Sequence, residues 1–248
     1  MRPHVVVVSG DLTQDARESQ FSEAREFLSR LPGRLIVVPG NHDLPFYNPV
    51  RRVSVGLDVY RRWISHDLEP SCADAEVAVV GVNTARVFGV RGGRINERQI
   101  EMVSARMRAA PPGAIRVLVT HHPFDVVERF GKRRVVGRAA LAMSRLAGCI
   151  DLLLAGHYHL ARWGHTAVHY RSHGRSAIFV QAGTAISTRV RGEPNSFNVI
   201  RLDNGRIDIQ HFSWDLRHRL FVGALTDVFA RAAGDWKRIP ETQALRAG

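Results

Sequence analysis

Four apolar segments of this chain each end directly in a short cluster of polar side chains. The segments are rich in valine, isoleucine and leucine, which is typical of strands buried on both faces of a parallel sheet. Because the carboxyl ends of parallel strands meet at one edge of an α/β sheet, we expect the polar clusters to form a single site there. The four segments cover residues 4–9, 35–38, 115–120 and 150–155.

The segments between these strands predict helices. In residues 21–31 apolar side chains recur at helical spacing, and Pro32-Gly33 ends the pattern. The resulting strand–helix–strand unit predicts two parallel strands with their polar turns on the same edge. Asn96 and Gln99 resemble a capping box that opens another helix. Further helices are expected near residues 55–66 and 138–146.

The pattern changes after about residue 160, where short apolar strands joined by tight turns predict an antiparallel arrangement. In residues 221–232 apolar side chains fall on one helical face, so we expect a C-terminal helix followed by a poorly ordered tail. We therefore divide the chain into a main domain of residues 1–215 and a C-terminal helix and tail of residues 216–248.

The composition excludes several classes of protein. Hydrophobic residues make up 45% of the chain, yet no apolar run approaches the ~20 residues of a membrane span. Cys72 and Cys149 are the only cysteines, which favours a reducing cytoplasm over a disulfide framework. The formal net charge is +12, but nearly all of the excess is arginine scattered along the chain. We therefore expect no specific nucleic-acid groove, although this field would attract a phosphate-bearing substrate.

The polar clusters offer nitrogen and oxygen donors to a metal. Mixed histidine, carboxylate and amide donors favour manganese, iron or zinc over calcium or a thiolate-binding metal. Taken alone, Asp11 could equally cap a helix or a turn, so the metal interpretation depends on the clusters meeting at one edge. The candidate residues are Asp11, Asn41, His42, Asp43, His121, His122, His157 and His159.

In their order along the chain, these clusters resemble the motifs of the calcineurin-like metallophosphoesterase family, in particular its bacterial branch of class III cyclic-nucleotide phosphodiesterases. The resemblance covers about residues 4–213 and implies a four-layer α/β/β/α sandwich with mixed sheets and two divalent metal ions. The matching motifs are Gly10-Asp11, Gly40-Asn41-His42-Asp43, His121-His122-Pro123, Gly156-His157-Tyr158-His159, Gln181-Ala182-Gly183-Thr184 and Ser187-Thr188-Arg189.

The resemblance also implies which residues bind the metals. Asp11 bridges the two ions. Asn41, His121 and His157 complete the second metal site. His159 belongs to the first metal site.

The implied chemistry is hydrolysis of a phosphoric ester. A hydroxide bound to the metals attacks the phosphate in line, so no serine or cysteine nucleophile is required. His42, oriented by Asp43, stabilises charge on the reacting phosphate or protonates the leaving alkoxide. His122 is expected to support the ligands rather than to bind a metal.

One family motif is missing from this sequence. The family begins with an Asp-x-His motif upstream of Gly10-Asp11, and nothing like it precedes the first strand. We therefore expect the first metal site to be incomplete in this chain, with an N-terminal strand and helix missing because of a late assigned start or a truncated gene. A genuinely reduced protein is the alternative.

Two functions follow from these expectations. The first is a metal-dependent phosphodiesterase that acts on small phosphodiesters such as cyclic nucleotides. The second is a truncated or non-catalytic relative that uses the same sandwich as an interaction surface. The expected partner is a small phosphodiester substrate, with no specific nucleic acid and no transmembrane segment, and the sequence leaves a homodimer open.

Overall fold

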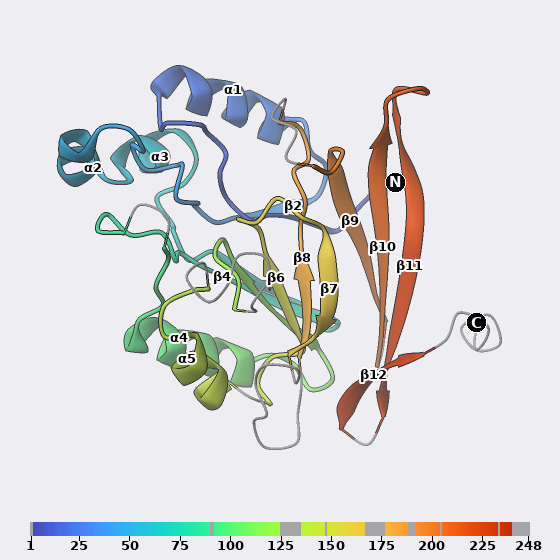
Figure 1. The fold of residues 1–248 in the computed structure, drawn as a ribbon. Coiled ribbons are helices and arrows are strands. Elements are labelled where there is room, and N and C mark those ends of the chain that lie inside the picture. Colours follow the sequence, from blue (N-terminus) through green and yellow to red (C-terminus); the bar gives the residue numbers. More distant parts are fainter. Residues whose placement is uncertain are drawn as a thin grey trace.

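The central element of the computed structural model is a mixed six-stranded sheet (Figure 1). The structure describes residues 2–89, 92–124, 135–146, 148–166, 177–187, 192–203, 205–232 and 234–239. In sheet order the strands are β3 (Ser71–Ala73), β4 (Val77–Val82), β5 (Ile115–Thr120), β6 (Leu152–Ala155), β8 (Ile178–Gln181) and β7 (Arg162–His165). The four inner strands run parallel, and β3 and β7 are antiparallel edge strands.

A second, smaller pair of strands confirms the predicted strand–helix–strand unit. β1 (Val5–Val8) and β2 (Arg34–Val37) are parallel and are joined by α1 (Glu18–Ser29). The N–H of Val38 donates to the carbonyl of Val8 at 3.1 Å, which extends the pairing to the end of both strands. The turns after β1 and β2 therefore begin side by side.

Three helices pack together near this pair. α2 (Pro49–Val55) and α3 (Asp58–Trp63) replace the single helix predicted for residues 55–66. Gly56, with a φ of 54°, separates them. Apolar side chains of α1, α2 and α3 share one buried cluster. No helix in the described ranges is both long and apolar enough to cross a membrane.

The C-terminal third forms a four-stranded antiparallel sheet in the order β12-β11-β10-β9. Its strands are β9 (Ser196–Asp203), β10 (Arg206–Asp215), β11 (Leu220–Ala232) and β12 (Asp235–Ile239). The helix predicted for residues 221–232 is therefore wrong, because this segment is β11. The predicted boundary after Asp215 falls at the turn between two strands of one sheet.

A β-bulge explains why β11 imitates a helical pattern. Phe229 pairs with Ile207, whereas Phe221 pairs with Trp214 after a register shift beside His211. Ile207 and Trp214 are an odd number of residues apart on one strand, so they face opposite sides of the sheet. The apolar residues of β11 therefore lie on both faces of the sheet. Their spacing resembles that of a helix, but pairing with β10 makes the segment a strand.

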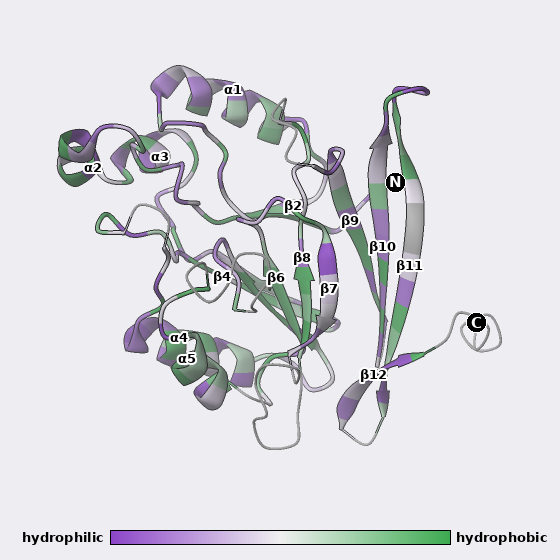
Figure 2. Cartoon of the chain, viewed as in Figure 1, coloured by the Kyte–Doolittle hydropathy of each residue, from purple (hydrophilic) through white to green (hydrophobic). Residues whose placement is uncertain are grey.

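Two large cores hold the layers together. α4 (Glu97–Arg108), which begins at the predicted capping box of Asn96 and Gln99, and α5 (Ala139–Leu146) cover one face of the six-stranded sheet. The other face packs against β1, β2 and the four-stranded sheet. Figure 2 shows hydrophobic residues along the central strands and both hydrophobic and hydrophilic residues on the helices.

This arrangement confirms the predicted α/β fold class with mixed sheets and helices. Figure 1 shows α4 and α5 on one side of the sheets and the four-stranded sheet on the other. Among the described residues, no helix covers the outer face of the four-stranded sheet.

Candidate metal centre

Four candidate ligands follow four different strands and meet at one place in the structure. Asp11 comes after β1 and Asn41 after β2, while His121 and His157 come after β5 and β6. Each pair of strands is parallel, which places the two turns of each pair on the same edge. The N–H of Gly156 also donates to the carbonyl of His121 at 3.1 Å and joins the turns after β5 and β6.

The donor atoms of these side chains lie close to one another. Oδ1 of Asn41 is 3.1 Å from Nε2 of His121 and 3.0 Å from Nδ1 of His157. The two ring nitrogens are 3.2 Å apart, and Nε2 of His121 is 3.4 Å from Oδ1 of Asp11. Atoms that bind one ion at about 2.0–2.2 Å in tetrahedral or octahedral geometry are about 2.8–3.6 Å apart. The mutual spacing of Asn41, His121 and His157 therefore fits a single divalent ion, and Asp11 adjoins this set beside His121.

The hydrogen bonding of His121 also fits a cation. Its Nδ1 lies 2.7 Å from the carbonyl oxygen of Ser9, which can only accept, so Nδ1 carries a proton. In the neutral ring, Nε2 then presents a lone pair toward the side-chain oxygens of Asn41 and Asp11. Lone pairs that face one another in a buried site repel unless a cation lies between them.

The backbone of the centre is held in unusual conformations. Asp11, His157 and His159 have φ angles of 56°, 75° and 60°, in the left-handed region that costs a non-glycine residue about 1–3 kcal/mol. Gly10, with a φ of 92°, allows the turn after β1 to approach His121, because a β-carbon there would lie 2.8 Å from its Nδ1. Strain of this kind concentrates at functional sites.

His42 lies beside the ligand cluster. Its main-chain N–H donates to Oδ1 of Asp11 at 2.9 Å, and its Nδ1 donates to the carbonyl of Gln14 at 2.9 Å. The imidazole stacks on Phe46, with ring centroids 4.3 Å apart and an interplanar angle of 10°. The prediction that Asp43 orients this ring is therefore wrong, because Gln14 and Phe46 hold it.

The carboxylate of Asp43 instead joins two of the ligand-bearing turns. It is fully buried, and Oδ2 accepts from the N–H of Gly40 at 2.8 Å. Oδ1 accepts from the N–H of Thr13 at 2.9 Å and from its hydroxyl at 3.2 Å. Burial and then the charge of Asp11 raise the pKa of Asp43 to about 7, against the lowering effect of the N–H donors. Asp43 thereby connects the turn after β1 with the turn after β2.

His122 is buried next to the ligand cluster. Its Nδ1 lies 2.9 Å from the hydroxyl of Thr84, and its ring centroid is 4.6 Å from that of His157. Burial, and then the neighbouring histidines, lower the pKa of His122 well below its ordinary value. Its Nε2 has no hydrogen-bond partner among the described residues. His121, His122 and His157 form a histidine group in which one ring nitrogen of each residue lies within 4.8 Å of those of the other two, so this group could also hold a metal ion.

His159 is held by a different part of the chain. Its Nδ1 lies 2.8 Å from the hydroxyl of Thr184, in the turn after β8. The carbonyl of Thr184 accepts from the N–H of Ser196 at 2.8 Å, so this turn is tied to the start of β9. The assignment of His159 to a first metal stays a prediction, and Thr188 and Arg189 of the neighbouring motif lie outside the described residues.

Sequence reasoning missed Arg52, which shapes the loop after Asn41. Arg52 is 2% exposed, and its guanidinium donates to four main-chain carbonyls at 2.9–3.3 Å. Because these partners are backbone oxygens, no side-chain pattern could have identified this arginine. The carbonyls belong to Asn41, Pro45, Arg86 and Val87.

Comparison with protein families and curated proteins shows similarity to phosphoesterases. The family model described as calcineurin-like phosphoesterase matches residues 1–161. The 3′,5′-cyclic adenosine monophosphate phosphodiesterases CpdA of two Escherichia coli strains are each 24% identical over 168 residues, which is 64% of this chain. The chain covers 57% of the length of these curated relatives.

Several solved structures are also similar. Vps29 from Chaetomium thermophilum is 12% identical, with a TM-score of 0.45 and coverage of 92% of this chain and 81% of that one. A single mutant of Vps29 from Entamoeba histolytica is 14% identical, with a TM-score of 0.44 and coverage of 91% and 84%. A putative 5′-nucleotidase from Staphylococcus aureus is 14% identical, with a TM-score of 0.46 and coverage of 97% and 48%.

Proposed function

Because this chain belongs to the calcineurin-like phosphoesterase family, we propose that it is a metal-dependent hydrolase of small phosphodiesters. The observation that carries the proposal is that four donor residues converge, with neighbouring donor atoms 3.0–3.4 Å apart. They come from four separate turns, and two of the donor residues, Asn41 and His121, are almost completely buried. Such a set of lone-pair donors is difficult to stabilise without a cation.

In this proposal the four converging residues hold one divalent ion, and Asp11 and His159 contribute to a second. Manganese, iron and zinc suit donors of this kind. When bound, such ions lower the pKa of a water molecule and neutralise charge on the phosphate oxygens. The four residues are Asp11, Asn41, His121 and His157.

His42 is the proposed proton donor to the leaving group. Since the carbonyl of Gln14 accepts the Nδ1 proton, Nε2 is the nitrogen left to act on a substrate. The stack on Phe46 fixes the plane of the ring and so the direction of that proton. General acid catalysis of this kind contributes about 10²–10⁴-fold to a rate.

The proposed substrates are small phosphodiesters, with cyclic nucleotides ranked first. The support is the similarity to the cyclic AMP phosphodiesterases CpdA, combined with the cyclic-nucleotide-type motifs of the sequence. Since the chain covers 57% of the length of those relatives, their activity is a starting point for assays of this chain.

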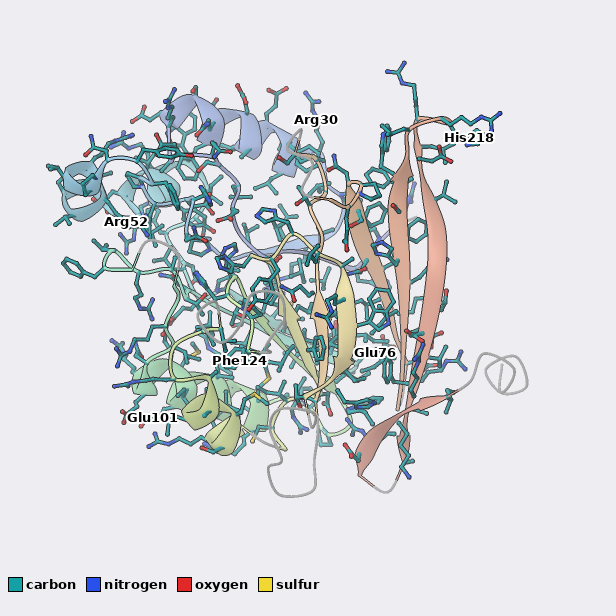
Figure 3. All side chains as sticks on the ribbon, viewed as in Figure 1. Arg30, Arg52, Glu76, Glu101, Phe124 and His218 are labelled. Carbon is teal, nitrogen blue, oxygen red and sulfur yellow. The ribbon has the colours of Figure 1, made fainter. Side chains whose placement is uncertain are left out.

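The test compares hydrolysis of a cyclic nucleotide, an aryl diester and an aryl monoester by manganese-supplemented protein. We expect diesters to be hydrolysed faster than the monoester, and His121→Ala to lower turnover by more than about 100-fold. The matched control is His218→Ala, because His218 (labelled in Figure 3) is an exposed histidine in the turn between β10 and β11. It should keep the wild-type rate.

Two results would overturn the proposal. One is hydrolysis that persists in metal-stripped protein or in His121→Ala. The other is metal binding without hydrolysis of any ester, which would favour the alternative of a non-catalytic relative that uses the fold as an interaction surface.

A further inference from the structure

An exposed pair of aromatic rings lies at the edge of the candidate metal centre. Phe46 is stacked on His42, as described above. The ring of Tyr47 contacts Phe46 edge-on, with centroids 5.1 Å apart and an interplanar angle of 73°. Tyr47 is 64% exposed. A continuous row of three rings therefore leads from the candidate proton donor to the surface.

Two charged side chains fix the loop that carries these rings. Oδ1 of Asp15 accepts from the N–H of Phe46 at 2.9 Å and from the N–H of Tyr47 at 3.3 Å. In addition, the guanidinium of Arg52, a buried residue of α2 (labelled in Figure 3), donates to the carbonyl of Pro45 at 3.1 Å. Because the backbone of the loop is held by both side chains, it does not have to be ordered when a ligand binds, and only the side chain of Tyr47 has to be fixed.

A rigid exposed aromatic ring beside a phosphate site suits one class of ligand. Bases stack on aromatic side chains with little dependence on their identity, and a tyrosine loses little side-chain entropy in doing so. An exposed tyrosine with no ligand would be unremarkable on a mobile loop, but here Asp15 holds its N–H and Phe46 supports its ring.

We propose that Tyr47, supported by Phe46, is a stacking surface for the nucleobase or other planar aromatic group of a phosphate ester bound at the metal centre. This inference rests on the proposed function for the position of the phosphate. It adds a recognition element that favours nucleotide esters over aliphatic ones. The element is tested by binding, so that its outcome is separate from that of the hydrolysis assay.

The experiment measures binding of adenosine 5′-monophosphate and of ribose 5-phosphate to manganese-supplemented protein by equilibrium dialysis. We expect the wild-type chain to bind the adenine-bearing probe about 5- to 150-fold more tightly, the range that one base–aromatic stack gives. Tyr47→Ala should remove this difference, and Tyr47→Phe should retain it because the ring remains. Both variants should keep the wild-type melting temperature, since Tyr47 is largely exposed.

Phe88→Ala is the matched control, because Phe88 is also an exposed aromatic residue (85%) but follows β4 rather than β2. It should retain the full preference for the adenine-bearing probe. The inference is overturned by equal affinities in the wild-type chain, by binding of neither probe, or by a preference that survives in Tyr47→Ala. A preference that depends on Tyr47 in a chain that hydrolyses no diester would support the stacking surface while the proposed function fails.

Discussion

The main chain of Gly40 lies directly against the side chain of Asp11. A β-carbon at position 40 would lie 2.1 Å from Oδ1 of Asp11 and 2.3 Å from its main-chain nitrogen. The same Oδ1 is 3.4 Å from Nε2 of His121. The turns after β1 and β2 therefore come together only because position 40 has no side chain. This contact fixes the position of Asp11, a candidate ligand.

We expect Gly40→Ala to disrupt the metal centre. Overpacking of this kind costs about 1–3 kcal/mol of stability, and it should also displace Asp11 and weaken manganese binding. Gly92→Ala is the control, because a β-carbon at that position has no neighbour within 4 Å. Thermal unfolding and manganese titration of both variants provide the measurement. Tight manganese binding by Gly40→Ala would contradict the expectation that this substitution disrupts the metal centre through Asp11.

Arg52 should be important for stability although it lies outside the ligand set. Arg52→Lys loses the planar fork that reaches several carbonyls at once, so we expect a loss of roughly 1.5–3 kcal/mol. Arg30→Lys is the matched control, because Arg30 is 72% exposed and pairs with Glu26 on the surface of α1. Denaturant unfolding measures both changes. Equal effects of the two substitutions would contradict the anchoring role of Arg52.

The sequence could predict the gathering of the candidate ligands because each follows a buried strand. The apolar runs before Asp11, Asn41, His121 and His157 identify parallel strands, and parallel strands place their following turns on one edge. The number and types of donors then follow from the residues themselves. This reasoning needs no knowledge of side-chain conformation.

Side-chain direction and long-range pairing were beyond the sequence. Asp43 follows His42 directly, yet their side chains contact different partners, because consecutive residues of a tight turn point in different directions. In β11 a single bulge moved apolar residues from one face to the other and produced a helical pattern. The guanidinium of Arg52 donates to four backbone oxygens, and backbone oxygens carry no residue-specific signal.

Asp151 should stabilise the fold without affecting the metal centre. At the start of β6, its Oδ1 accepts from Arg231 at 2.6 Å and from the indole of Trp236 at 3.1 Å, while Oδ2 accepts from the N–H of Arg116 at 2.9 Å. Asp151→Ala leaves the buried indole N–H without its acceptor, so we expect a loss of at least about 2 kcal/mol. Unfolding curves and manganese titration test this together. Weakened manganese binding with unchanged stability would contradict the prediction.

The Asp151→Ala experiment needs a control variant in which an exposed carboxylate is removed. Asp58→Ala is suitable, because Asp58 is 64% exposed and pairs with Arg61 on the surface of α3. It should change stability by less than about 1 kcal/mol.

Removal of divalent ions should destabilise the wild-type chain, because the four candidate ligands then have neighbouring donor atoms 3.0–3.4 Å apart without a cation between them. An ion present at 100 times its Kd stabilises a protein by about 2.7 kcal/mol, so chelation should lower the melting temperature measurably.

In His157→Ala the loss of Nδ1 weakens ion binding, and the effect of chelation on the melting temperature should shrink. His218→Ala should show the full wild-type effect, since His218 is exposed and pairs with Asp215. Melting curves with and without a chelator decide the matter, and equal shifts in His157→Ala and the wild-type chain would exclude His157 as a ligand.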